Sequence, residues 1–236
     1  MSKRRKVTLS MVVRNETGRY LERMLRRTRE WIDEAVIIDD ASSDDTVELC
    51  YRSLPSIPVH LVRNKASCFH QEAKLRRQQW EETVRHEPEW ILNLDADELI
   101  EAGFATMLND VIDQDQFDLV GFRLYDMWNE SEYREDMYWQ AHRFYRPFMV
   151  RYRPEIDYSV WREKKQHCGR FPVVVDTFAC LCHTARIQHF GWARETDRIA
   201  KYSRYQRLDP GAKFGWQEQY DSILDPSPNL KPWTEA

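Results

Sequence analysis

The chain lacks the sequence signatures of several common protein classes. It has no apolar run of membrane-spanning length, and the run at 7–13 is too short and too polar for a signal peptide. No G-x-G-x-x-G follows that first run and no P-loop is present, which disfavours a dinucleotide-binding enzyme and a P-loop NTPase. We therefore expect a cytoplasmic protein without a transmembrane segment.

The cysteines also lack a pattern. There are five, an odd number, and none are arranged as C-x-x-C, which favours a reducing compartment over a disulfide framework. Cys180, Cys182 and His183 can be combined into a zinc site, but their spacing does not fit a closed structural site. In an extended strand Cys180 and Cys182 share one face, so we expect them to pack rather than to bind zinc.

Positive and negative charges nearly balance, since the net charge is −4 over 236 residues. The protein as a whole is not suited to binding polyanions, and we expect no nucleic-acid partner. Hydrophobic residues make up 42% of the chain, enough for one large α/β domain with a buried core. The nine tryptophans and eleven tyrosines can line a sugar-binding cleft or fill the core, and their number does not choose between these roles.

Strand and helix patterns alternate through the first part of the chain. Short apolar runs predict strands, and apolar stripes of helical period predict the helices between them. The strands are expected at 7–13, 35–38, 59–62 and 90–94, and the helices at 16–29, 46–54 and 70–85. This alternation favours right-handed βαβ units and a mostly parallel central sheet flanked by helices, an α/β fold. Ligands of such sheets bind beyond the carboxyl ends of the strands.

The remainder of the chain has a looser pattern. We expect helices at 104–112 and 194–207, strands at 119–124, 144–153 and 173–181, and a polar, aromatic loop at 125–140. The last stretch, 209–236, contains several prolines and predicts an extended tail that wraps the domain. Residues 1–236 are therefore expected to form a single domain.

Two carboxylates follow the strand predicted at 90–94. Asp95 and Asp97 are two residues apart, so an extended backbone directs both side chains the same way. Carboxylate oxygens beside a diphosphate form a site for Mn²⁺ or Mg²⁺, which can neutralise the charge on a nucleoside-diphosphate leaving group. The alternative is a solvated strand end or a helix cap.

A second acidic stretch follows the strand predicted at 35–38. A carboxylate at this place, and we favour Asp40, can accept hydrogen bonds from ribose hydroxyls or from a base N–H. Ser43 or Asp44 can cap the helix that begins at 46, and for Asp44 we favour capping.

Three segments together resemble family 2 glycosyltransferases of the GT-A fold. They are VTLSMVVRNE at 7–16, VIIDDASSDDT at 36–46 and WILNLDADE at 90–98, and their order and spacing match over about 7–125. The resemblance implies a nucleoside-diphosphate-sugar donor with UDP as the default nucleotide, a divalent metal, inversion, and a saccharide or other hydroxyl acceptor. By the same resemblance, about 7–125 would bind the nucleotide sugar and about 126–208 would serve the acceptor and catalysis.

The resemblance also implies roles for individual residues. The nucleotide-sugar contacts would be Val13 and Asn15 in the nucleoside pocket, Asp40 at the base or ribose, Arg76 or Arg77 near the donor, and Asp95 at the ribose or sugar. Asp97 would hold the metal.

Two later segments are similar to the family as well. HRFYR at 142–146 is similar to an Arg-aromatic segment, and RIQHFGW at 186–192 to a late His-aromatic-Gly segment. The second makes His189 the candidate third metal ligand. The alternative for His189 is a histidine packed at a strand end.

The chain departs from the family pattern at the position expected for the catalytic base. Inverting members need a carboxylate that takes the acceptor proton. Short relatives often carry His-Glu where this chain has His167-Cys168, and a cysteine is a poor substitute. His167 and Glu163 are our first candidates. Asp157 and the pair Glu135-Asp136 remain open.

Two other functions compete with this interpretation. A haloacid-dehalogenase-type phosphatase also places Asp-x-Asp after an apolar strand, but it needs Thr or Val with Gly where this chain has Glu98-Leu99-Ile100, and its nucleophile follows an early strand. The non-enzyme alternative is a GT-A domain that binds nucleotide sugar or carbohydrate without turnover, and the uncertain base motivates it.

Overall fold

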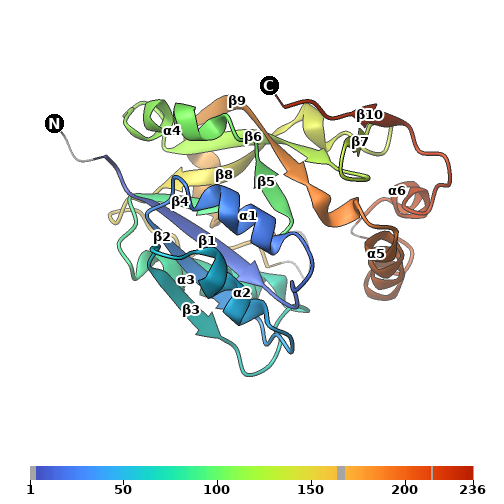
Figure 1. Ribbon diagram of the computed structural model, residues 1–236, viewed down its shortest axis with the longest axis horizontal. Coiled ribbons are helices and arrows are strands. Elements are labelled where there is room, and N and C mark those ends of the chain that lie inside the picture. The colour runs from blue at the N-terminus through green and yellow to red at the C-terminus, as the bar shows by residue number, and fades with distance from the viewer. Residues whose placement is uncertain (1–3, 164–167, 214, 236) are drawn as a thin grey trace.

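A computed structural model describes residues 4–163, 168–213 and 215–235. An eight-stranded sheet with the order β3-β2-β1-β4-β8-β6-β9-β5 forms the centre, and a two-stranded ribbon, β10-β7, lies beside it (Figure 1). Among the described residues, no helix combines the length and the apolar character needed to cross a membrane.

The first part of the chain forms the parallel half of the sheet. Its strands are β1 (Val7–Val13), β2 (Glu34–Asp39), β3 (Val59–Arg63) and β4 (Trp90–Asn93), and its helices are α1 (Leu21–Thr28), α2 (Thr46–Ser53) and α3 (Glu72–Val84). Each of these strands pairs in parallel with its neighbour, which confirms the predicted βαβ arrangement. Helix α1 begins later than predicted because Gly18 has φ +70°, a left-handed conformation that a helix cannot contain.

The second half makes the sheet mixed rather than parallel. Its elements are β5 (Glu98–Ile100), α4 (Phe104–Ile112), β6 (Leu119–Asp126), β7 (Glu132–Arg134), the 3₁₀ helix η1 (Ala141–Arg143), β8 (Tyr145–Arg151) and β9 (Cys180–His189). Strand β8 runs antiparallel to both β4 and β6, β9 runs parallel to β6, and β5 runs antiparallel to β9. The chain therefore forms an α/β fold whose parallel character is confined mainly to the first half.

The prediction of a strand at 173–181 is wrong over most of that range. Val173–Thr177 form a 3₁₀ helix, η2, and the strand begins only at Cys180. Val175 is buried in a cluster with Trp80, so packing outweighs the β-propensity of the valine run. Cys180 is half-buried as expected, but Cys182 is exposed. The described residues contain no cluster of three or more metal-binding side chains.

The C-terminal segment is less extended than predicted. It follows the 3₁₀ helix η3 (Phe190–Trp192) and α5 (Glu195–Leu208), and it contains α6 (Gln217–Ser222) and β10 (Leu230–Pro232). Strand β10 pairs antiparallel with β7, so the segment does wrap the domain. Figure 1 shows α5 and α6 side by side, and the rings of Tyr205 and Tyr220 stack between them with centroids 4.9 Å apart.

Most of the large aromatic residues build the core. A main cluster packs β1, β2 and β4 against α1, and a second cluster surrounds Trp80 on α3. A third, smaller cluster contains Trp128, Trp139 and Trp192, next to the carboxyl end of β9. The high aromatic content is thus largely explained by burial.

Candidate functional site

The loops after β1 and β2 are joined by side-chain hydrogen bonds. The Asn15 N–H donates to Ser42 Oγ (3.0 Å), and the Ser43 N–H donates to Asn15 Oδ1 (2.8 Å). Asn15 has φ 52°, a conformation that asparagine tolerates better than most residues. Val13 ends β1 and is buried. Both predicted nucleoside-pocket residues therefore lie at the carboxyl end of the parallel strands.

Asp45 rather than Asp44 occupies the N-cap position of α2, but Asp44 accepts a hydrogen bond from the first N–H of the helix. The Thr46 N–H donates to Asp44 Oδ1 over 3.1 Å, and the Thr17 N–H donates to Asp44 Oδ2 over the same distance. This carboxylate thus stabilises the start of α2 and fixes the loop after β1.

Asp40 holds the loop that follows β3. Its carboxylate is fully buried and accepts hydrogen bonds from Asn64 Nδ2 (3.1 Å), Ser67 Oγ (2.6 Å) and the Cys68 N–H (2.8 Å). Burial opposes ionisation, but these hydrogen bonds outweigh it and lower the pKa of Asp40 below its ordinary value. Direct contact with a nucleoside would require the loop 64–68 to move, whereas positioning that loop requires no movement.

Asp95 lies between two arginines. Arg76 Nη2 donates to Asp95 Oδ1 over 2.8 Å, and Arg170 Nη1 lies 3.5 Å from Asp95 Oδ2. Burial works against the charge, yet Arg76 and Arg170 hold the pKa of Asp95 well below its usual range. The Asp95 N–H donates to Glu98 Oε2 (2.8 Å), and Glu98 in turn binds Arg170. Asp95 is therefore ionised and fixed in position.

Asp97 and His189, predicted from distant segments, meet at the end of the sheet. Pairing of β5 with β9 places Glu98 opposite His189, and His189 Nε2 lies 3.7 Å from Asp97 Oδ2. On its other side, His189 Nδ1 is 2.7 Å from Asp126 Oδ1 at the end of β6. Burial disfavours the charged imidazole, but Asp97 and the hydrogen bond to Asp126 raise the pKa of His189.

This arrangement fits a divalent metal. When a carboxylate accepts the Nδ1–H of a histidine, the Nε2 lone pair is left free for a metal, and here it faces Asp97. One carboxylate oxygen and one imidazole nitrogen suit Mn²⁺. These two side chains would leave the other coordination positions to donor oxygens and water.

The first prediction concerns the effect of Asp126 on metal affinity. Asp126→Asn replaces the charged acceptor of the His189 Nδ1–H by a neutral amide, which fixes the tautomer less strongly, and we expect Mn²⁺ affinity to fall roughly 10- to 100-fold, as for other partners of metal-binding histidines. Calorimetric titration of Mn²⁺ measures this effect. Asp113→Asn, an exposed position after α4, is the matched control. Equal Mn²⁺ affinity in Asp126→Asn and the wild type would contradict the role of Asp126.

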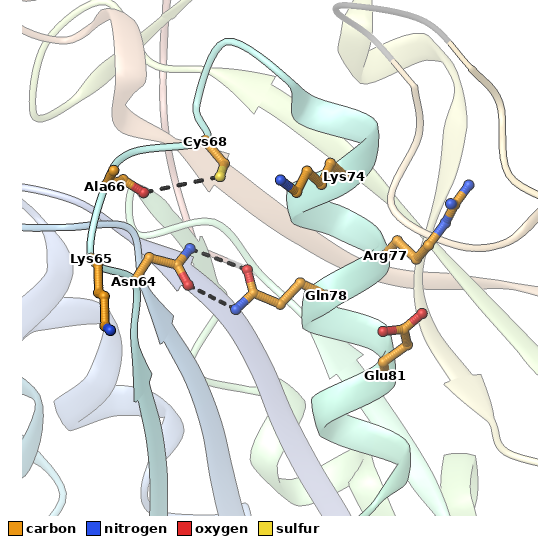
Figure 2. Close-up of a pocket in the computed structure, with 8 residues that line it drawn as sticks. All are labelled: Asn64, Lys65, Ala66, Cys68, Lys74, Arg77, Gln78 and Glu81. Carbon is orange, nitrogen blue, oxygen red and sulfur yellow. Dashed lines mark hydrogen bonds between the residues drawn. The ribbon is translucent and has the colours of Figure 1, made fainter.

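Arg77 forms an ion pair with Glu163. Arg77 Nη2 donates to Glu163 Oε1 over 2.6 Å, and Glu163 is largely exposed. Figure 2 shows Arg77 on α3 beside a cavity of about 410 Å³ between that helix and the loop after β3. Asn64 and Gln78 close one side of it through paired amide hydrogen bonds of 3.1 and 2.8 Å. The cavity adjoins the loop that Asp40 holds, and neither Asp97 nor His189 lines it.

The other candidate bases have different surroundings. His167 lies outside the described residues. Asp157 is exposed and accepts the Ser159 N–H (2.9 Å). Asp136 is paired with the buried Arg134 (2.6 Å), and Glu135 lies 3.5 Å from Arg143, so both carboxylates are already engaged.

Two residues that complete the site were missed by sequence reasoning. Asp126 is the last residue of β6, but it lies in the range 125–140, for which the polar, aromatic pattern predicts a loop. Arg170 gave no local signal, because it reaches Asp95 and Glu98 from a segment more than seventy residues later.

Known proteins resemble this chain in sequence. The profile of the family described as Glycosyl transferase family 2 matches residues 8–163. An uncharacterized protein of Mycobacterium tuberculosis is 25% identical over 235 residues, covering 92% of this chain and 54% of that protein. This chain therefore spans about half the length of the curated relatives it matches.

Solved structures share the fold. The crystal structure of S. aureus TarS aligns with a TM-score of 0.56 at 13% identity, covering 93% of this chain and 42% of that chain. TarS in complex with UDP-GlcNAc aligns with a TM-score of 0.55 at 15% identity, covering 93% of this chain and 70% of that one. The match of the family profile over most of the chain, on a GT-A fold, shows that the chain belongs to glycosyl transferase family 2.

Proposed function

We propose that the protein transfers a sugar from a nucleoside-diphosphate-sugar, with UDP as the nucleotide, to a hydroxyl group of a saccharide or other acceptor. The proposal includes dependence on Mn²⁺ or Mg²⁺. The observation that carries it is the convergence of Asp97, His189 and Asp126 at the strand ends of a family 2 domain. The fold shared with TarS, which was solved with UDP-GlcNAc, supports UDP as the first nucleotide to test.

In this proposal Asp97 and His189 hold the metal. The metal supplies charge neutralisation at the nucleoside-diphosphate leaving group. Val13 and Asn15 line the nucleoside pocket, and Asp40 positions the nucleoside through the loop it holds or by direct contact.

The donor-side arginine and the base follow from the surroundings of α3. Arg76 takes the role next to the donor, because it contacts Asp95 whereas Arg77 faces Glu163. Asp95, held ionised, accepts hydrogen bonds from hydroxyl groups of the ribose or the sugar. Glu163 or His167 would take the proton of the acceptor hydroxyl, and attack opposite the leaving diphosphate inverts the anomeric carbon.

Calorimetric titration of UDP into the purified protein tests the proposal. We expect binding in the presence of Mn²⁺ and its loss in EDTA, followed by UDP release when UDP-sugars are supplied. Failure of UDP, GDP, dTDP and CDP to bind under both conditions would refute a nucleoside-diphosphate site. Metal-dependent binding without UDP release from any UDP-sugar would instead identify a domain that binds without turnover.

A further inference from the structure

Helix α5 crosses the candidate site from one end to the other. Just before the helix, Arg194 Nη2 donates to the Gly18 carbonyl after β1 (2.9 Å), and in its first turn Asp197 pairs with Arg19 (3.0 Å). Further along, the guanidinium of Arg204 lies 5.7 Å from the ring of Phe69. Phe69 belongs to the segment that continues from the loop held by Asp40. Figure 1 shows α5 beyond the ends of the strands.

Lys201 lies at the middle of this helix and reaches the metal-binding side chains. Its Nζ is 4.3 Å from the ring centroid of Trp192. A Cβ on Gly191 would lie 2.6 Å from Asp97 Oδ2 and 2.6 Å from His189 Nε2, and closer still to Lys201 Nζ. These three side-chain tips therefore converge on the small space that the missing side chain of Gly191 leaves.

The ammonium of Lys201 faces the carboxylate of Asp97, which is also the proposed metal ligand. Among the residues that the structure describes, no carboxylate lies within ion-pair distance of Lys201 or of Arg204, which is one helical turn away on the same face. A metal bound to Asp97 would take up that carboxylate's charge, and a half-buried cation left without a counter-ion is unfavourable. It also repels a divalent metal held by Asp97 and His189 unless an anion lies between them.

We propose that Lys201 binds the diphosphate of the donor, between the nucleoside held by the loop after β3 and the metal held by Asp97 and His189. The inference rests on the proposed function. A nucleoside diphosphate bound at both ends would carry its diphosphate past the face of α5 that bears Lys201 and Arg204. Bound there, the anion neutralises both Lys201 and the metal. A lysine ammonium suits this task as a compact point charge.

The test compares Lys201→Met with the wild type in three calorimetric titrations. Loss of a charge-assisted hydrogen bond should lower UDP affinity in Mn²⁺ by roughly 10- to 100-fold. Uridine affinity should not change, because uridine has no phosphate. Affinity for Mn²⁺ alone should rise, because the neutral methionine removes a repelling charge. A purely structural role of Lys201 would lower all three affinities together.

Two controls define the comparison. Arg207→Met removes one positive charge from an exposed position of the same helix and should leave all three affinities unchanged. Lys201→Arg retains the charge and should retain most of the UDP affinity. Unaltered UDP binding by Lys201→Met, or a parallel loss of UDP, uridine and Mn²⁺ binding, would overturn the inference alone. If the wild type binds no nucleoside diphosphate, the proposed function fails and the inference fails with it.

Discussion

Replacing Asp97 by asparagine is expected to remove Mn²⁺-dependent UDP binding and to lower sugar transfer by at least roughly 100-fold. A neutral amide is a much weaker metal ligand than a carboxylate, and His189 alone cannot hold the ion. The fold should persist, because the two side chains have nearly the same shape. The carboxylate of Asp97 also lies at a strand end, where its ion-pair neighbour among the described residues is His189 at 3.7 Å.

Three measurements on Asp97→Asn separate this result from unfolding. Thermal unfolding followed by circular dichroism should match the wild type, calorimetry should show the loss of UDP binding in Mn²⁺, and UDP release from UDP-sugars should be absent. Asp110→Asn, on the exposed surface of α4, removes the same charge far from Asp97 and should behave as the wild type. Wild-type UDP affinity that still responds to EDTA in Asp97→Asn would place the metal elsewhere.

The parallel half of the fold could be predicted because its information is local. Strands β1, β2 and β4 are apolar runs buried on both faces, and β1 and β2 are each followed by a helix with a buried face. Once the strands are parallel, the acidic residues after β2 and β4 must meet at one edge. The prediction that His189 joins Asp97 has a different origin, because it follows from the resemblance to the family's His-aromatic-Gly segment. The structure brings these two side chains together.

The second half could not be predicted from local pattern. Its strands interleave in the order β8-β6-β9-β5, so Asp126 and His189, far apart in the chain, become neighbours only through the pairing of β6 with β9. Arg170 reaches Asp95 from a segment without regular structure. The valines at 173–175 show the same limit, because burial beside Trp80 decides their conformation.

Burial also changes the interpretation of a residue that the sequence singled out. Asp40 follows β2 as expected of a nucleoside-binding carboxylate, but its oxygens are occupied by Asn64, Ser67 and the Cys68 N–H. Sequence alone places such a residue at the strand end and cannot say whether its carboxylate faces a ligand or a loop. Its position in the site was predictable, and its partners were not.

Gly191→Ala is expected to fold normally and yet to lose metal-dependent UDP binding by roughly 10- to 100-fold. A Cβ at this position would lie within 3.0 Å of the tips of Asp97, His189 and Lys201, and contacts this close force atoms to shift. Because all three atoms are ends of side chains, the backbone can stay in place while the side chains turn away. The metal ligands would then no longer face one another.

The matched control for this change is Gly103→Ala. Gly103 precedes α4 and has no atom within 4 Å of its missing Cβ, and neither glycine has a positive φ that alanine would strain. Both variants should therefore unfold at temperatures close to the wild type, and only Gly191→Ala should fail in calorimetric titration of UDP with Mn²⁺. Uridine binding should survive in both, because the loop held by Asp40 lies apart from Gly191. Wild-type UDP affinity in Gly191→Ala would mean that the space above Gly191 is not where metal and diphosphate meet.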